Sequence, residues 1–304
     1  GEYVFDQEWA QAYARHGLAY YPKLVAAIPF TPASGPRLLI APGADNGEIV
    51  AHINQTLRAL TGQTGASGWH ILFPQEDELA LWQQSGVDHR LGCQFHWRNR
   101  DYQSFDDFLA GLNAKRRKEI RRERRRVLEQ GIRLQRLTGD DLTIEHWAQF
   151  YPFYCDTYQR RSGHDGYLTE DFFLAIHRSL RRQVLLVLAY DQADIAIGGA
   201  LCFYSDDTLY GRYWGALQDI ECLHFEACLY QGIEFCIERG LKRFDPGAQG
   251  EHKIPRGFEP VLTHSLHYLA HDGFRQAVSD FLARERPAVR SYAEAARALL
   301  PFRK

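Results

Sequence analysis

The chain has 304 residues, a length typical of about two domains, and its 45% hydrophobic and 24% charged residues are typical of a soluble globular protein. A net charge of -2 excludes a globally basic nucleic-acid-binding protein, although local basic patches remain open. The sequence has no run of eighteen apolar residues, so we expect no membrane span.

The 6 cysteines include no CxxC pair, and most of them lie in apolar surroundings. We therefore expect reduced, buried thiols in a cytoplasmic protein. The first residues lack the basic and apolar regions of a secretory signal. The sequence contains no methionine, so either the protein is unusual or modified methionines and the native start are missing from this sequence. We favour the second interpretation, and exact spacings therefore carry less weight.

The first part of the chain has the pattern of mixed helices and strands. Its periodicities predict a helix over 5–16, a strand over 37–41, a helix over 46–60, a strand over 70–73, a helix over 76–84 and a strand over 93–97. One long helix is predicted over 105–130, because Ser104 is a suitable N-cap and Gly131 a suitable stop signal.

The second half of that long helix, residues 115–126, has nine basic residues among twelve. Such a helix is either a solvated face across a domain junction or a patch that attracts the phosphates of a nucleotide-bearing substrate or of RNA. Arg121, Arg122 and Arg125 are the candidate phosphate-binding residues. No aromatic residues are interleaved, so we do not expect a surface that reads bases.

The later part of the chain has a clearer pattern. It predicts strand 132–137, helices 144–161 and 169–182, strands 183–190, 195–204 and 208–216, helix 223–239, strands 241–244 and 261–270, and helices 274–284 and 287–300. Tight turns join the three consecutive strands into an antiparallel meander. The glycine-rich polar loop over 243–258 is a type of segment that often carries binding and catalytic groups.

This order of elements is that of a GNAT-type N-acyltransferase domain, and five segments resemble the FemAB-like predicted N-acyltransferases. These segments are residues 92–99 (GCQFHWRN), 105–125, 209–215 (LYGRYWG), 223–240 and 243–260. The resemblance implies an α+β protein of two GNAT-like halves, each a mostly antiparallel sheet flanked by helices, with a cleft between them. It also implies missing upstream residues, so the first half is expected to be truncated. We expect an N-terminal half over 1–112, a basic connecting helix over 113–131 and an acyltransferase domain over 132–304.

Acyl transfer to an amine requires a group that accepts a proton and a site that stabilises charge on the carbonyl oxygen. Glu251 and His252 in the polar loop are candidate bases. Glu226, at the start of the helix after the meander, is a third candidate, although an acidic residue there also favours the helix dipole. Tyr213 could protonate a leaving group, although a half-buried strand tyrosine is the commoner case.

Five further residues are candidate substrate contacts. Lys253 and Arg256 could hold a phosphate or carboxylate, and Arg212, His224 and Gln249 lie on the same segments. Within the resemblance, His252 stands where related acyltransferases carry tyrosine. The glycine-rich pyrophosphate loop of acetyl-CoA-dependent members is not recognisable before residue 223.

The sequence therefore predicts an N-acyltransferase that moves an acyl group from acyl-CoA, as co-substrate, to a small-molecule or peptide amine by direct attack. Aminoacyl-tRNA is the alternative donor, and a non-catalytic binding module on the same fold is a further alternative. No permanently bound cofactor is expected. No metal is expected either, because Cys93 and His96 would point to opposite faces of a strand.

Overall fold

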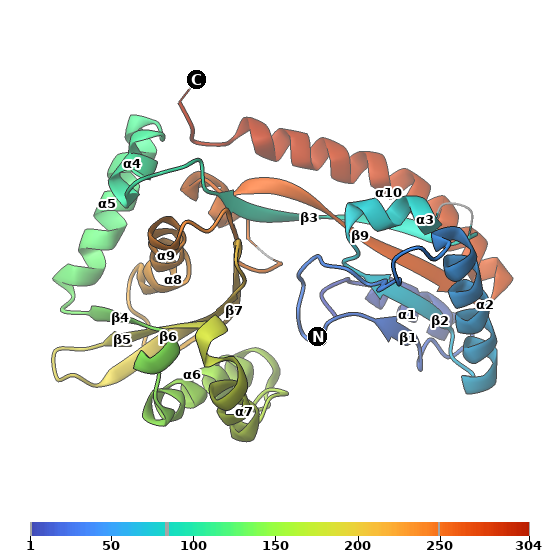
Figure 1. Ribbon diagram of the computed structural model, residues 1–304, viewed down its shortest axis with the longest axis horizontal. Helices are drawn as coiled ribbons and strands as arrows, with labels where there is room; N and C mark the ends of the chain where they lie inside the picture. Colours follow the sequence, from blue (N-terminus) through green and yellow to red (C-terminus); the bar gives the residue numbers. More distant parts are fainter. Residues whose placement is uncertain (1, 83–84, 249, 304) are drawn as a thin grey trace. The chain divides into compact units, whose positions relative to one another are not determined.

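The computed structural model describes residues 2–82, 85–248 and 250–303 and has two compact units (Figure 1). Unit 1 consists of Gly1–Gln94 and Pro260–Ala298, and unit 2 consists of Phe95–Glu259 and Leu299–Lys304. These units differ from the three segments expected from the sequence. The chain returns to unit 1 after residue 259, and the basic helix lies within unit 2.

Unit 1 combines helices with a small sheet. Its elements are α1 (Gln7–Arg15), β1 (Leu24–Ala26), α2 (Asn46–Thr64), β2 (Gly68–Leu72), α3 (Leu79–Trp82), the first part of β3 (Asp88–Arg98), β9 (Glu259–Leu269) and α10 (Asp272–Ala298). β2 pairs in parallel with β1 and antiparallel with β9. Trp69, Ile71 and Leu266 of the sheet pack with Trp82 of α3 and Val50 of α2 in a buried cluster.

Two predictions for unit 1 were wrong. Residues 37–41 form no strand, because the backbone N–H groups of Arg37 and Leu38 donate to the side chain of Glu78 instead of to a neighbouring strand. The two predicted C-terminal helices are one helix, α10, which continues through Pro287. Proline removes one N–H from a helix, but buried side chains on both sides of Pro287, such as Leu282 and Ala293, keep one face of α10 against the protein.

Unit 2 contains the meander and most of the other predicted elements. They are α4 (Phe105–Ala110), α5 (Ala114–Glu129), β4 (Arg133–Leu137), α6 (Ile144–Ser162), α7 (Glu170–Leu180), β5 (Val184–Tyr190), β6 (Ala196–Tyr204), β7 (Thr208–Ala216), α8 (Leu223–Phe225), a π-helical segment (Glu226–Tyr230), α9 (Gln231–Arg239), β8 (Arg243–Asp245) and a 3₁₀ helix, η5 (Glu251–Arg256). The strands of this unit lie in the order β3–β8–β7–β6–β5–β4. Of the neighbouring pairs in this order, β7 and β8 are parallel and the other pairs are antiparallel.

The core of unit 2 is aromatic. Trp147, Phe150 and Phe153 of α6 and Phe173 of α7 are buried with the side chains of β5 and β6. Gly215 of β7 lies so close to α6 that a Cβ atom there would be 1.9 Å from the carbonyl oxygen of Phe153. The helix and the meander are therefore in direct backbone contact at this point.

The predicted long helix over 105–130 is two helices. Ser104 caps α4 by accepting from the N–H of Asp107, as expected. Helix α4 ends with Gly111 as its C-cap, and Asn113 then caps α5 by accepting from the N–H of Arg116. A cap satisfies N–H groups that have no partner within the helix, so Asn113 gives α5 a start of its own.

Both units are mixed α/β structures in which mostly antiparallel strands are combined with helices, so the predicted fold class is confirmed. Within the described residues, no helix has both the length and the apolar composition needed to cross a membrane.

A buried histidine pair lies in the sheet of unit 1. The Nδ1 atoms of His70 on β2 and His267 on β9 are 2.7 Å apart, and His267 Nε2 lies 2.8 Å from the hydroxyl of Ser265. Each imidazole is 1% exposed. Burial lowers the pKa of His70 to about 3 and holds the pKa of His267 well below its usual value. Both rings are therefore neutral at pH 7.

The stability of unit 1 should fall as the pH decreases below about 6.5. The unfolded chain then binds protons at His70 and His267, whereas the folded chain does not, so each histidine costs about 2 kcal/mol between pH 7 and pH 5. The loss should continue toward the pKa of about 3 for folded His70. Hydrogen exchange of the β2 amides at pH 7 and at pH 5 measures this loss of stability.

The His267→Gln variant should lose part of this pH dependence, whereas the same change at exposed His16 should keep all of it. Equal protection at pH 7 and pH 5 in the unmodified protein would contradict the assignment.

Candidate functional site

The parallel pairing of β7 with β8 ends early. The two strands pair at only three positions, from Thr208 to Tyr210 on β7, and β8 stops at Asp245, whereas β7 continues to Ala216. A register shift in the pairing with β6 makes Arg212 an extra residue on β7, and such a bulge bends a strand. The end of β7 therefore has no pairing with β8.

An open cavity of about 480 Å³ lies at the end of β7 within unit 2. Side chains from α6, β7, the connection after β7 and the start of α8 line it. They are Asp156, Thr157, Arg160, Arg161, Trp214, Ala216, Gln218, Asp219, Ile220, Glu221, Leu223 and His224. Arg160 pairs with Asp156 at 2.9 Å, whereas Arg161 is exposed.

Two predicted site residues, His224 and His252, lie next to each other. Their ring centroids are 5.9 Å apart, and His224 lines the cavity. Burial is the main cause that lowers the pKa of His224 to about 4, and the nearby His252, Lys253 and Arg256 lower it further. Partial burial and the charges of Lys253 and Arg256 also lower the pKa of His252. Both rings are neutral at pH 7, and a neutral imidazole nitrogen can accept a proton.

Glu251, the other predicted base of the loop, is the first residue of η5 and is exposed. Its role as a base stays a prediction.

Lys253 lies inside the protein, with 5% of its surface exposed. Its ammonium group donates to the carbonyl oxygen of Gly247 at 2.9 Å and lies 3.4 Å from that of Pro246. Burial lowers the pKa of Lys253 to about 8, against the opposing effect of Asp245. Lys253 therefore stabilises the polar loop through its backbone. The predicted binding of a substrate anion by Lys253 stays a prediction, and its buried position does not favour it.

Arg256 is also buried, with 7% of its surface exposed. It donates to the carbonyl oxygen of His252 at 2.6 Å, to the hydroxyl of Tyr230 at 2.8 Å and to the carboxylate of Glu123 at 2.6 Å. Because the guanidinium of Arg256 already donates to these three protein groups, its position does not favour the binding of a substrate anion. Sequence reasoning missed Glu123 and Tyr230. The signal for Glu123 was its spacing of three residues from Ile120 on the buried face of α5.

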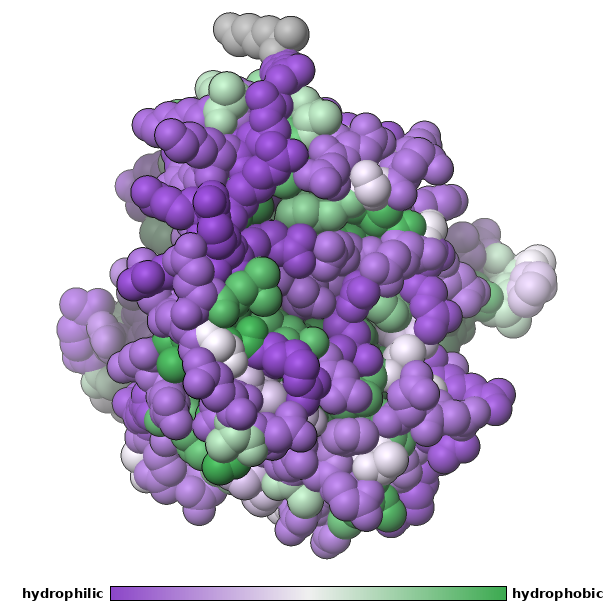
Figure 2. Space-filling model, turned by 90° about the vertical axis from the view of Figure 1, so that its left-hand side faces the viewer, coloured by the Kyte–Doolittle hydropathy of each residue, from purple (hydrophilic) through white to green (hydrophobic). Residues whose placement is uncertain are grey.

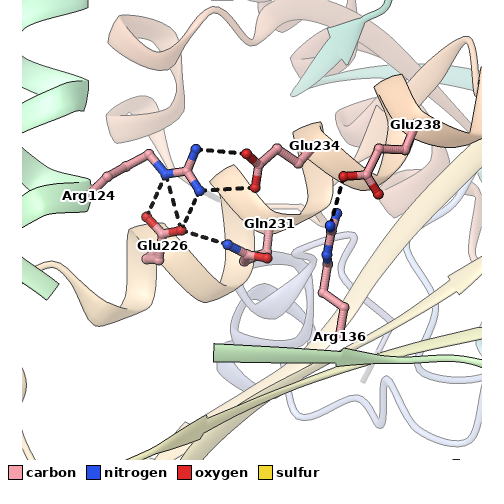
Figure 3. Close-up of polar contacts among 6 residues, drawn as sticks. All are labelled: Arg124, Arg136, Glu226, Gln231, Glu234 and Glu238. Carbon is pink, nitrogen blue, oxygen red and sulfur yellow. Dashed lines mark hydrogen bonds and ion pairs between the residues drawn. The ribbon is translucent and has the colours of Figure 1, made fainter. Parts of the chain in front are cut away.

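Glu226 is 4% exposed and makes a charged contact with α5 (Figure 3). The guanidinium of Arg124 lies between the carboxylates of Glu226 and Glu234 with nitrogen–oxygen distances of 3.0–3.2 Å, and Gln231 donates to Glu226 at 2.7 Å. These contacts attach the Glu226 carboxylate to protein groups of α5 and α9. The predicted catalytic role of Glu226 stays untested, and this geometry favours a structural role.

The basic helix α5 presents only part of its charge to solvent. Arg121, Arg122 and Arg125 are all exposed, and Arg121 pairs with Asp106 at 2.8 Å, whereas Arg124 contacts buried Glu226. Arg121, Arg124 and Arg125 contribute to a second cavity of about 590 Å³, whose lining also includes apolar residues such as Leu128. Figure 2 shows the face on the left-hand side of Figure 1, where α5 is labelled; most side chains on it are hydrophilic, and hydrophobic side chains form smaller patches. Phosphate binding by these arginines stays a prediction.

The remaining predicted residues are less informative. Tyr213 packs against the aromatic core, with its ring centroid 5.1 Å from that of Tyr154. The guanidinium of Arg212 lies 5.4 Å from the Tyr213 ring. Gln249 lies outside the described residues. Among the described residues, no group of three or more His, Cys, Asp or Glu side chains could hold a metal ion.

A family model described as peptidoglycan biosynthesis/recognition matches residues 1–304 of this chain. The chain belongs to the FemAB-like family. This membership supports the coarse function, a transferase related to peptidoglycan. No curated protein sequence matches this FemAB-like chain.

Three solved structures have a fold similar to that of this FemAB-like chain. L-PGS from Bacillus licheniformis is 12% identical with a TM-score of 0.52, over 77% of this chain and 79% of that one. The C-terminal domain of a putative lysylphosphatidylglycerol synthetase from Agrobacterium fabrum is 10% identical with a TM-score of 0.52, over 78% of each chain. FemX is 12% identical with a TM-score of 0.51, over 83% of this chain and 85% of that one. At these identities the likeness shows the fold alone.

The cluster around Arg124 should contribute more to stability than the neighbouring pair of Arg136 and Glu238, whose atoms lie 2.8 Å apart (Figure 3). An Arg124→Met variant leaves the buried carboxylate of Glu226 without its cation, so we expect a loss of about 2–3 kcal/mol in the free energy of unfolding. The matched Arg136→Met variant should lose about 0–1 kcal/mol, because its partner is more exposed. Urea unfolding measures both, and equal losses would contradict the ranking.

Proposed function

We propose that this protein is an N-acyltransferase that moves an acyl group from acyl-CoA to an amine by direct attack. The observation that carries the proposal is the early end of the β7–β8 ladder beside an open cavity that His224 lines. Membership of the FemAB-like family supports a transferase at this site.

The residues support a simple reaction path. The neutral amine nitrogen attacks the acyl carbonyl carbon, and the bond from that carbon to the donor sulfur then breaks. Backbone N–H groups of β7 beyond Tyr210, past the ladder with β8, are the candidate donors to the oxygen that becomes negative. The amine proton passes to a neutral imidazole, for which we propose His252 with His224 beside it. The acceptor is a small-molecule or peptide amine.

The arginines of the cavity support a donor that carries phosphate groups. Both Arg160 and Arg161 are exposed and line the cavity, and Arg161 is the better candidate because Arg160 is paired with Asp156. A guanidinium matches the geometry of phosphate oxygens. A cytoplasmic location, where acyl-CoA is available, is part of this proposal.

Aminoacyl-tRNA is the second candidate donor. The exposed side chains of Lys118, Arg122 and Arg125 on α5 favour it, because an RNA backbone is attracted by such a row of charges. One structure of similar fold is named a putative lysylphosphatidylglycerol synthetase, which supports an aminoacyl group as the transferred unit.

Calorimetric titration with acetyl-CoA and a longer acyl-CoA, at two salt concentrations, tests the donor. We expect micromolar binding that an Arg161→Glu variant weakens at least about ten-fold, because it replaces a phosphate contact by a like charge. Arg182→Glu is the matched control, since Arg182 is exposed and does not line the cavity. No binding of either acyl-CoA, together with salt-dependent tRNA binding that an Arg122→Glu/Arg125→Glu variant weakens, would favour the second donor.

The His252→Asn variant should reduce kcat by about 100-fold or more, with donor affinity unchanged, because general base catalysis typically contributes about 10²–10⁴. The pKa of His252 is lowered, so the neutral base is fully present at pH 7 and activity should decline only below about pH 6.5. The pH dependence of kcat measures this limit. His271→Asn, at an exposed position of unit 1, is the control. Unchanged turnover in His252→Asn would remove this residue from the mechanism.

A further inference from the structure

Two adjacent residues of α5 contact the two ends of the π-helical segment. Arg124 binds Glu226, its first residue, and Glu123 accepts a hydrogen bond from the hydroxyl of Tyr230, its last residue. The insertion of a π turn into a helix is frequent at functional sites. The contact between Glu123 and Tyr230 is also shared by a residue of the polar loop.

This residue of the polar loop is Arg256 of η5. Its Nη2 donates to Glu123 at 2.6 Å, its Nε donates to the Tyr230 hydroxyl at 2.8 Å, and its guanidinium lies 3.5 Å from the centroid of the Phe225 ring. The three polar side chains are buried. Burial is the main cause that raises the pKa of Tyr230 above its ordinary value, so the hydroxyl stays protonated. The carboxylate of Glu123 balances the guanidinium of Arg256, since an unpaired buried charge would be costly.

The last link in this chain of contacts is the backbone of His252. Nη1 of Arg256 donates to the carbonyl oxygen of His252 at 2.6 Å. The imidazole of His252 extends from this fixed backbone toward His224, at a centroid separation of 5.9 Å. A bond to the backbone fixes where the loop residue lies without using its side chain.

We propose that Glu123 and Tyr230 are positioning residues, which hold His252 beside His224 through Arg256. The inference rests on the proposed function, in which His252 accepts the amine proton. Neither residue touches the reacting atoms. Their effect is to keep η5 and its imidazole in one place, because reacting groups that are misplaced by about 1 Å can lose about 100-fold in rate.

Three variants of the full chain test the proposal. Glu123→Gln keeps the side-chain size and removes the charge that balances Arg256. Tyr230→Phe keeps the ring and removes the hydroxyl, so it is the milder change. Glu119→Gln is the matched control on the same helix, because Glu119 pairs with Arg116 of α5 at 2.5 Å and not with the loop.

Two measurements need no substrate. The first is NMR titration of the histidine side chains, with His252 assigned by comparison with His252→Asn. His224, Lys253 and Arg256 face this imidazole, so its release should raise its pKa toward the free value of about 6.5. The second is trypsin cleavage after Lys253 and Arg256, which should be at least about ten-fold faster in Glu123→Gln.

Tyr230→Phe should change both measurements in the same direction by a smaller amount, and Glu119→Gln should change neither. If Glu123→Gln does not fold, Tyr230→Phe decides. Unchanged His252 titration and unchanged cleavage in the folded variants would overturn the proposal. Once a donor and acceptor are known, kcat should fall about 10–100-fold in Glu123→Gln at nearly constant KM. A protein without any turnover would contradict the proposed function, while titration and cleavage would still decide the positioning.

Discussion

The structure of unit 2 depends on two neighbouring side chains of α5 with opposite charge. Glu123 binds Arg256 and Tyr230, and Arg124 binds Glu226 and Glu234. Each charge is compensated, and both contacts are largely withdrawn from water, where ion pairs interact more strongly than at an exposed surface. They attach α5 to the π-helical segment, to α9 and to the polar loop at once.

This constraint changes the interpretation of the basic helix. The composition of α5 suggests a surface that binds phosphates. Arg124, however, is paired with buried Glu226, and Arg121 is paired with Asp106. The charge that remains toward solvent comes from residues such as Arg122 and Arg125. A helix can therefore combine an internal electrostatic contact on one face with a weaker external attraction on another, and only the second could serve a nucleic acid.

The polar loop shows a comparable division between support and chemistry. Lys253 and Arg256, whose charges suggested substrate contacts, donate to groups of the protein and hold the loop. His252 remains at the surface next to His224, which lines the cavity. Burial, and then the positive charges of Lys253 and Arg256, lower the pKa of His224 and His252, so the residues that order the loop also help to keep both imidazoles neutral.

The sequence by itself determined the meander and the helices that follow it, because side-chain periodicity and turn residues are local signals. The class of fold followed from the resemblance to a family. It could not determine that residues 37–41 are held by Glu78, that α4 and α5 are separate, or that α10 continues through Pro287. The first and the last depend on contacts with residues far apart in the chain, whereas α5 starts at a local cap, Asn113, that side-chain periodicity did not show. The spacing of Glu123 from Ile120 indicates a buried position but not a partner: Arg256 is 133 positions away, and only the tertiary structure brings the two charges together.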